Sequence, residues 1–222
     1  MPIVETLDYP KKSHRKDVRL PAESVELAEF FGIMIGDGGI NNPWQANITL
    51  NTDADASYIP FVRALIIDLF RVAPRVMRRK NQKATVLSLA STSVVDFLVE
   101  KGLVRGNKLV HGLLIPSWIL AQNTYKMACV RGLMDTDGCL VLHKHKIRNR
   151  VYSNIYLSFS SRSHGLLEQV AEILLDSGLE PHIAGNGREV WLYSRKDVEK
   201  YLDKIGSSNE RLLSIYRAWR GG

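Results

Sequence analysis

Hydrophobic positions in residues 27–35 recur with the spacing of a helix. The apolar side chains are those of Leu27, Phe30, Phe31, Met34 and Ile35. Steps of three and four residues place them on one buried face. Ser24 is a suitable N-cap, and Gly38 and Gly39 are suitable for ending a helix. The pattern predicts a buried helix that ends in an acidic residue, Asp37, followed by glycine.

The same segment recurs 100 residues further along the chain. Residues 30–38 and 130–138 are both apolar, carry a glycine in mid-helix, and end in an acid followed by glycine. Self-similarity at a fixed offset indicates two copies of one structural unit. The repeat also duplicates the terminal acid, as Asp37 and Asp137.

Small side chains form a second stripe on each predicted helix. The stripes are Ala28, Gly32 and Gly36 in the first copy, and Ala128, Gly132 and Thr136 in the second. Small residues in register let two helix backbones approach closely. If the helices pack through these stripes, Asp37 and Asp137 meet at one end of the pair. The alternative is that the glycines simply lie near helix ends.

After each motif the hydrophobic period changes from helix to strand. The sequence predicts strands at 44–50 and 150–160, helices at 55–70 and 164–176, hairpins at 74–90 and 180–194, and closing helices at 93–102 and 195–205. The predicted fold class is α+β, with two αββαββα half-units paired through their motif helices. The expected divisions are an N-terminal basic arm (1–23), a first half (24–104), a linker (105–122) and a second half (123–222).

Composition is that of a globular protein, and the net charge suits a polyanionic partner. Apolar residues make up 45% and charged residues 24%, and the net charge is +7. That charge suits nucleic acid without establishing it. Cys129 and Cys139 lack zinc-ligand spacing and are expected to be reduced thiols. With no signal peptide or membrane span evident, we expect an intracellular, reducing compartment (cytoplasm, nucleoid or organelle), no secretion and no membrane partner.

The paired motifs, their spacing, the element order and the linker sequence IPSWI together resemble the LAGLIDADG homing endonucleases, in the single-chain form with two motifs. The resemblance covers roughly residues 24–216. Ile35 stands where the motif often has Asp, whereas Asp135 keeps it. Both copies retain the final acid.

The resemblance implies a specific architecture and activity. The two motif helices form the interface, and each half presents a saddle-shaped antiparallel sheet to the major groove of duplex DNA. One carboxylate from each helix binds a divalent metal, normally Mg²⁺. The expected reaction is hydrolysis of both strands of an asymmetric site of about 20 base pairs, leaving short 3′ overhangs, by a monomer.

The residue types fit that chemistry. Phosphodiester hydrolysis uses a metal to activate water, and Mg²⁺ needs only one or two protein carboxylates besides phosphate and water. Asp37 and Asp137 are the predicted catalytic metal ligands, and the backbone carbonyls of Gly36 and Thr136 are predicted to add to them. The alternative is that each Asp merely ends a helix before a C-cap glycine, although the helix dipole disfavours an acid there.

Further site residues come from the resemblance. It implies that Asn51 and Ser160 position water. It also implies that Lys108 and Arg211 stabilise charge on the phosphate. The alternative for the two cations is a solvated loop position.

A DNA-reading surface is predicted from strand periodicity. Lys144, Lys146, Arg148 and Arg150 alternate and would share a face if the strand runs through, which a turn near Asn149 would prevent. The other predicted DNA contacts are Arg75, Arg78, Arg79 and Lys80 in the first half, and Tyr152, Asn154 and Tyr156 in the second. The alternative for each is a solvated strand face.

Three functions remain open at this point. An active endonuclease is favoured over a catalytically silent DNA-binding protein, because both terminal acids and Lys108 are retained. An RNA maturase that assists intron splicing is the third, with intron RNA as a further candidate partner. We do not expect an intein, since the first and last residues are not splicing nucleophiles.

Overall fold

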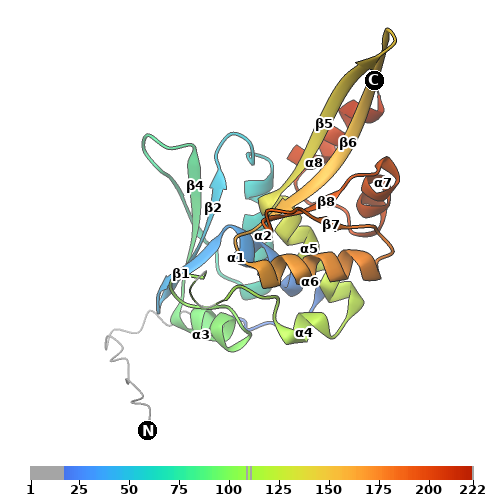
Figure 1. Ribbon diagram of the computed structural model, residues 1–222. Coiled ribbons are helices and arrows are strands. Elements are labelled where there is room, and N and C mark those ends of the chain that lie inside the picture. Colours follow the sequence, from blue (N-terminus) through green and yellow to red (C-terminus); the bar gives the residue numbers. More distant parts are fainter. Residues whose placement is uncertain (1–17, 109, 111, 222) are drawn as a thin grey trace.

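The structure is a computed structural model that describes residues 18–108, 110 and 112–221, without the side chains of residues 147 and 151. The greater part of the predicted N-terminal arm, residues 1–17, lies outside the described residues. The order of helices and strands confirms the predicted repeat (Figure 1). No described helix is long and apolar enough to cross a membrane.

The element bounds are as follows. The first half contains α1 (Val25–Gly36), β1 (Gly38–Asn42), β2 (Gln45–Asn51), α2 (Tyr58–Phe70), β3 (Arg75–Arg78), β4 (Ala84–Ala90) and α3 (Thr92–Glu100). After α4 (Ser117–Leu120), the second half contains α5 (Asn123–Asp137), β5 (Gly138–Ile147), β6 (Arg150–Ser160), α6 (His164–Asp176), β7 (His182–Ile183), β8 (Glu189–Leu192), α7 (Arg195–Lys204) and α8 (Glu210–Arg220).

Helices α1 and α5 pack directly against each other through their glycines. A Cβ atom on Gly32 would lie 2.1 Å from the carbonyl oxygen of Cys129, and one on Gly132 would lie 2.3 Å from that of Glu29. No side chain fits at such distances without moving a backbone. Ala28 and Ala128 are also buried. The predicted helix interface is therefore confirmed.

Each half contributes one four-stranded antiparallel sheet, with strand orders β1-β2-β4-β3 and β5-β6-β8-β7. Along β2, Ala46, Ile48 and Leu50 are buried in the core, whereas the alternate residues are partly exposed. Each sheet therefore has a core face and an open face. Figure 1 shows the two sheets rising on either side of α1 and α5, with α3, α4 and α6 below them.

The β5–β6 hairpin turns at Arg148 and Asn149, whose φ angles of 45° and 65° are left-handed. Two consecutive residues of this kind form the tight turn that suits a two-residue hairpin. The strand therefore does not run through to Arg150, which pairs instead with Ile147. The prediction that four alternating cations share one face is wrong.

Strand register shows where those cations lie. Lys144 is opposite Ser153, two positions from the Leu142–Ile155 pair, so it is on the core-face side of the sheet. Lys146 follows the same alternation. Tyr152, Asn154 and Tyr156 alternate with these positions and lie on the open face, as predicted, together with Arg150.

Two helices were not predicted. Besides α4 in the linker, α8 begins at Asn209, whose side chain accepts from the backbone N–H of Arg211. Leu212 is fully buried, and Trp219 donates to the carbonyl of Ser153 at 3.0 Å. Helix α8 thus fastens the C-terminal part of the chain to the β5–β6 hairpin.

Candidate functional site

Two aspartates lie together where α1 and α5 end. Asp37 is the C-cap of α1, and Asp137 is the last residue of α5. A Cβ atom on Gly36 would lie 2.8 Å from Oδ2 of Asp137, so this carboxylate reaches across to the end of the other helix. The close packing of the helices is what brings the repeated acids together.

The surroundings of these acids disfavour their charged forms. Burial raises the pKa of Asp37 to about 7, with further increases from Asp137 and Asp55 and opposing effects from Lys108 and Arg211. Burial also raises the pKa of Asp137, and Lys108 lowers it. Two carboxylates held in this way favour a bound cation that balances both charges.

Lys108 is held at the end of α1. Its Nζ donates to the carbonyl oxygens of Met34, Ile35 and Gly36 at 3.3, 2.8 and 2.7 Å. These are terminal carbonyls, where the helix dipole favours a positive charge. Burial lowers the pKa of Lys108, whereas Asp137 and Asp37 raise it.

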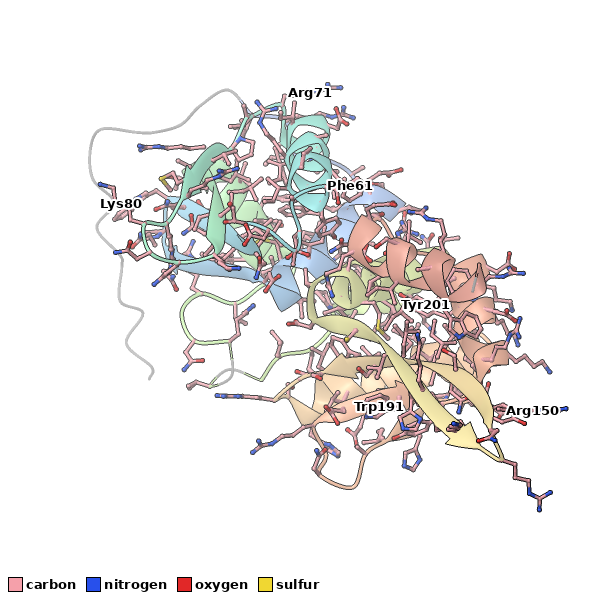
Figure 2. All side chains as sticks on the ribbon, turned by 90° about the horizontal axis from the view of Figure 1, so that it is seen from above. Phe61, Arg71, Lys80, Arg150, Trp191 and Tyr201 are labelled. Carbon is pink, nitrogen blue, oxygen red and sulfur yellow. The ribbon has the colours of Figure 1, made fainter. Side chains whose placement is uncertain are left out.

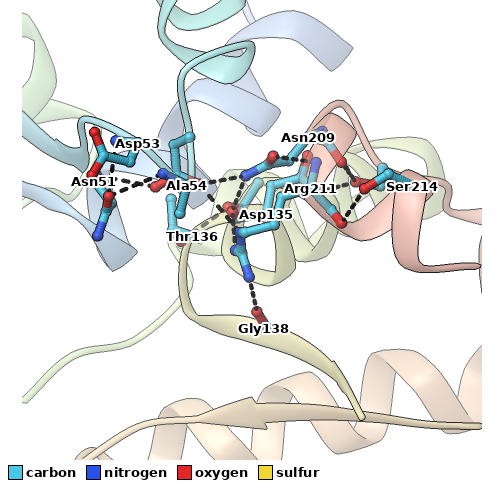
Figure 3. A network of polar contacts seen from close by, with 12 residues as sticks. Asn51, Asp53, Ala54, Asp135, Thr136, Gly138, Asn209, Arg211 and Ser214 are labelled. Carbon is cyan, nitrogen blue, oxygen red and sulfur yellow. Dashed lines mark hydrogen bonds and ion pairs between the residues drawn. The ribbon is translucent and has the colours of Figure 1, made fainter. Parts of the chain in front are cut away.

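Arg211 is held in the corresponding way at the end of α5 (Figure 3). Its guanidinium donates to the carbonyls of Asp135 and Gly138 at 3.2 and 3.3 Å and to Oδ1 of Asp55 at 3.2 Å. Asn209 donates to the same Asp55 oxygen at 3.0 Å. Both predicted cations therefore lie beside a motif-helix terminus, and Arg211 has a carboxylate partner as well.

Asn51 and Ser160, the predicted water-positioning pair, differ in their contacts. Asn51 Oδ1 accepts from the backbone N–H groups of Asp53 and Ala54, both at 3.0 Å, so this oxygen holds its own turn. Ser160 lines a pocket of about 490 Å³ that also contains Asp137 and Lys108. Ser160 thus shares a pocket with a predicted catalytic acid, whereas the Asn51 oxygen is used within its own turn; both roles stay predictions.

A metal at this site would depend on few protein ligands. Among the described residues, no group of three or more His, Cys, Asp and Glu side chains is arranged to hold a metal. The Gly36 carbonyl accepts from Lys108, and the Thr136 hydroxyl donates back to the carbonyls of Gly132 and Leu133. The two carboxylates would hold Mg²⁺ with phosphate and water, a ligand set that this ion accepts. Coordination by the Gly36 and Thr136 carbonyls stays a prediction.

Asp135 belongs to a buried network that the sequence did not reveal. Its carboxylate accepts from Ser207 Oγ at 2.5 Å and from the backbone N–H of Ser208 at 2.7 Å. Burial raises its pKa to about 7. Glu29 extends the network by accepting from Ser208 and Arg131, both at 2.6 Å. Asp135 thus anchors the loop before α8. The only hint of this role in the sequence was the presence of Asp135 in the repeated motif.

On the first sheet, the predicted DNA contacts divide between two faces. Arg75 pairs with Ser88 and shares the open face with Gln45, whereas Arg78 pairs with Thr85 on the core face. Arg79 follows Arg78 and continues the open-face alternation. Lys80 is at the hairpin tip, and Figure 2 places it and Arg150 at opposite ends of the molecule.

On the second sheet, the open face is rich in rings. His145 stacks on Tyr152 at 5.5 Å, and Tyr193 contacts Tyr156 and Trp191 at 5.7 and 5.4 Å. Sequence reasoning named only the tyrosines of β6, because the partners come from other strands. The first sheet has no matching ring network among its described residues, so the two open faces differ in chemistry.

The comparisons with known proteins agree with this geometry. Residues 124–206 match the family model of the LAGLIDADG-like domain. The structure is similar to the crystal structure of I-DmoI in complex with DNA and Mn, with a TM-score of 0.55, 19% identity, and coverage of 83% of this chain and 98% of that chain. It is also similar to the I-LtrWI LAGLIDADG homing endonuclease bound to target DNA, with a TM-score of 0.58, 10% identity, and coverage of 87% and 88%.

Two further similarities are partial. Full-length DUF199/WhiA from Thermatoga maritima matches with a TM-score of 0.56 and 16% identity over 90% of this chain and 61% of that chain. The replication factor C small subunit of Methanocaldococcus jannaschii is 27% identical over 196 residues, which are 85% of this chain and 10% of that protein. The chain thus spans a tenth of this relative.

The matched domain and the fold agree on one family. The family model covers the second half, and the repeated motif, the paired glycine helices and the two antiparallel sheets extend the likeness over the first half. Residues 124–206 thus match the LAGLIDADG-like domain, and the described chain has the fold of the solved structures of I-DmoI and of the I-LtrWI LAGLIDADG homing endonuclease.

Proposed function

We propose that this protein is a divalent-metal-dependent endonuclease that hydrolyses both strands of a long, asymmetric duplex DNA site. The observation that carries the proposal is the pair Asp37 and Asp137 at the adjoining ends of α1 and α5, with Lys108 interacting electrostatically with both carboxylates. Structures of similar fold were determined with target DNA and with Mn, Mg or Ca.

The acid pair suits this reaction better than a purely structural role. Among the described residues, the carboxylates of Asp37 and Asp137 have no hydrogen bond or ion pair that would offset the cost of two neighbouring negative charges, and burial raises the pKa of both. When bound, a divalent ion supplies an activated water and charge stabilisation on phosphate. The two aspartates would hold that ion, and Lys108 and Arg211, at the ends of α1 and α5, would add positive charge near the phosphate.

The rest of the molecule supplies DNA recognition in this proposal. The two sheets flank α1 and α5 (Figure 1), and we propose that a duplex lies against their open faces and passes over the acid pair. A saddle of this size suits a site of about 20 base pairs. One chain provides both halves, so we expect a monomer to cut both strands and to leave short 3′ overhangs.

The test is selection and cleavage from a randomised duplex library, with and without Mg²⁺. We expect a single selected sequence family that is cut on both strands only when Mg²⁺ is present. Duplex that is bound but never cut would instead indicate a silent DNA-binding protein. Failure to bind duplex together with tight binding of structured intron RNA would indicate a maturase.

A further inference from the structure

The loops that follow β2 and β6 are structurally equivalent. The backbone N–H of Thr52 donates to the carbonyl of Lys83 at 3.0 Å, and that of Ser161 donates to the carbonyl of Arg188 at 3.0 Å. Each bond joins the end of a strand to the neighbouring hairpin of the same half. These matched bonds identify Lys83 with Arg188, and they identify the next residue in each loop, Asp53 with Arg162.

Around the loop that follows β2, the cations, Lys83 from the first half and Arg211 from the second, have acidic partners from the first half. Lys83 Nζ lies 3.0 Å from Oδ2 of Asp53, and Arg211 lies 3.2 Å from Oδ1 of Asp55. The second pair is the stronger, because its side chains are only 24% and 11% exposed. We call this set of four residues the paired flank; its two cations and two carboxylates balance.

In the second half, the corresponding region is positive. The pocket of about 490 Å³ that contains Asp137 and Ser160 is lined by three cations and two acids. Besides the proposed metal ligand Asp137, its charged residues are Lys108, Arg162, Arg188 and Glu189. Glu189 accepts instead from Trp191 at 3.2 Å. Arg162 and Arg188 are exposed, and neither has an acidic partner within the described part of the chain. We call these four residues the open flank.

We propose that Arg162 and Arg188 bind the scissile phosphate of one DNA strand, and that the two strands are therefore cut in a fixed order, with the strand at the open flank first. The inference rests on the proposed function and adds the order of the two cuts. Each cut is the same hydrolysis: a water oxygen bonds to phosphorus, one P–O bond to the leaving oxygen breaks, and that oxygen gains a proton.

The difference between the flanks follows from electrostatics. Negative charge builds up on phosphate in the transition state, and a cation that is already in place stabilises it. A cation held by a carboxylate has much of its field cancelled, and it must leave that partner to bind phosphate fully. At the paired flank, Asp53 and Asp55 therefore weaken the interaction of Lys83 and Arg211 with phosphate. At the open flank, no such acid weakens the interaction of Arg162 and Arg188 with phosphate.

The first experiment measures the cutting of each strand separately. The selected duplex carries a different fluorophore on each strand, and cleavage is started with Mg²⁺. We expect wild-type protein to cut one strand about tenfold faster than the other, with a nicked intermediate. Arg162→Gln with Arg188→Gln should slow the fast strand about tenfold and leave the slow one within about twofold. Asp53→Asn should speed the slow strand.

A matched control and a binding measurement complete the test. Arg63→Gln removes one positive charge from an exposed position on α2 and should leave the ratio of the two rates unchanged. Independently, a neutral methylphosphonate is placed at each backbone position of the selected duplex in turn, and affinity is measured. For the wild type, we expect a methylphosphonate at the central phosphate of one strand to lower affinity more than one at the central phosphate of the other strand. This difference in affinity should vanish in the double variant.

The outcomes separate the inference from the proposed function. Metal-dependent cleavage with equal strand rates, or a double variant that slows both strands alike, overturns the inference and leaves the function standing. Binding without cleavage overturns the function and the order of cutting with it, and the methylphosphonate asymmetry then decides whether Arg162 and Arg188 bind a central phosphate. Absence of duplex binding overturns both.

Discussion

Asp37 and Asp137 are the residues on which the proposed activity depends, because their carboxylates would hold the metal. Asp37→Asn or Asp137→Asn should lower cleavage of both strands by about a thousandfold or more, since a metal site supplies several kcal/mol of transition-state stabilisation. DNA affinity should stay within about threefold, because neither side chain reads bases. Cleavage assays and fluorescence anisotropy on the same duplex measure the two effects. Either variant cutting at the wild-type rate would contradict the assignment.

The raised pKa of Asp37 leads to a pH dependence with a definite sign. A carboxylate must lose its proton to bind metal, so a pKa of about 7 means that activity falls as the pH drops through 7. Metal and proton compete for the same group. Raising the Mg²⁺ concentration should therefore move the midpoint of the rate profile to lower pH. Rate profiles at two Mg²⁺ concentrations measure this shift; an unmoved midpoint would show that the titrating group is not a metal ligand.

At the residue scale, the sequence predicted which residues lie at the site better than it predicted their hydrogen-bond partners. It identified Lys108 and Arg211, and the structure places both at motif-helix ends. It did not identify Asp55, whose bond to Asn209 joins residues 154 apart in the chain. Local pattern carries no information about such a contact, because it depends on how the two halves pack.

At the scale of the helices, the close contact of α1 and α5 predicts that a larger side chain at Gly132 lowers the stability of the protein. Gly132→Ala would put a Cβ atom 2.3 Å from the carbonyl oxygen of Glu29, so the helices must separate. Overpacking of this kind costs about 1–3 kcal/mol. We expect a lower Tm and, because the acids move apart, cleavage reduced about tenfold or more.

Gly39→Ala is the matched control for stability, because a Cβ atom there has no neighbour within 4 Å. Its Tm should stay close to that of the wild type. Thermal melting followed by circular dichroism compares the three proteins. A Gly132→Ala protein that melts and cuts like wild type would be incompatible with the helix interface described above.

Helices and strands were predicted correctly where interactions between residues close in the sequence determine them. The strand over residues 150–160 and the helix over 164–176 match β6 and α6, because alternation and helical spacing were clear there. The β5–β6 turn was only an alternative, since polar alternation continues through Arg148 and Asn149 and cannot reveal positive φ angles. Helix α8 was missed although Leu212, Ile215 and Trp219 recur at helical spacing.

At the scale of the whole molecule, a net charge of +7 predicts binding that depends strongly on salt. Basic side chains release counterions from phosphates, and each phosphate contact contributes about −0.9 to the slope of log affinity against log salt. Arg162→Gln with Arg188→Gln should make this slope shallower by about one, because both side chains contact the same phosphate in the proposal, whereas Arg63→Gln should leave the slope unchanged. Titrations at several salt concentrations measure the slope. An unchanged slope in the double variant would place both arginines away from the DNA.

The unlike open faces of the two sheets predict that each half of the site is read independently. Arg75 lies on the open face of the first sheet and Asn154 on that of the second, and such side chains discriminate bases by about 1–3 kcal/mol. Arg75→Ala should relax sequence preference in one half-site, and Asn154→Ala in the other. Lys144→Ala, on the core-face side, should weaken binding slightly without changing preference. Sequencing the DNA that each variant selects decides this, and a change in both half-sites from one substitution would refute independent reading.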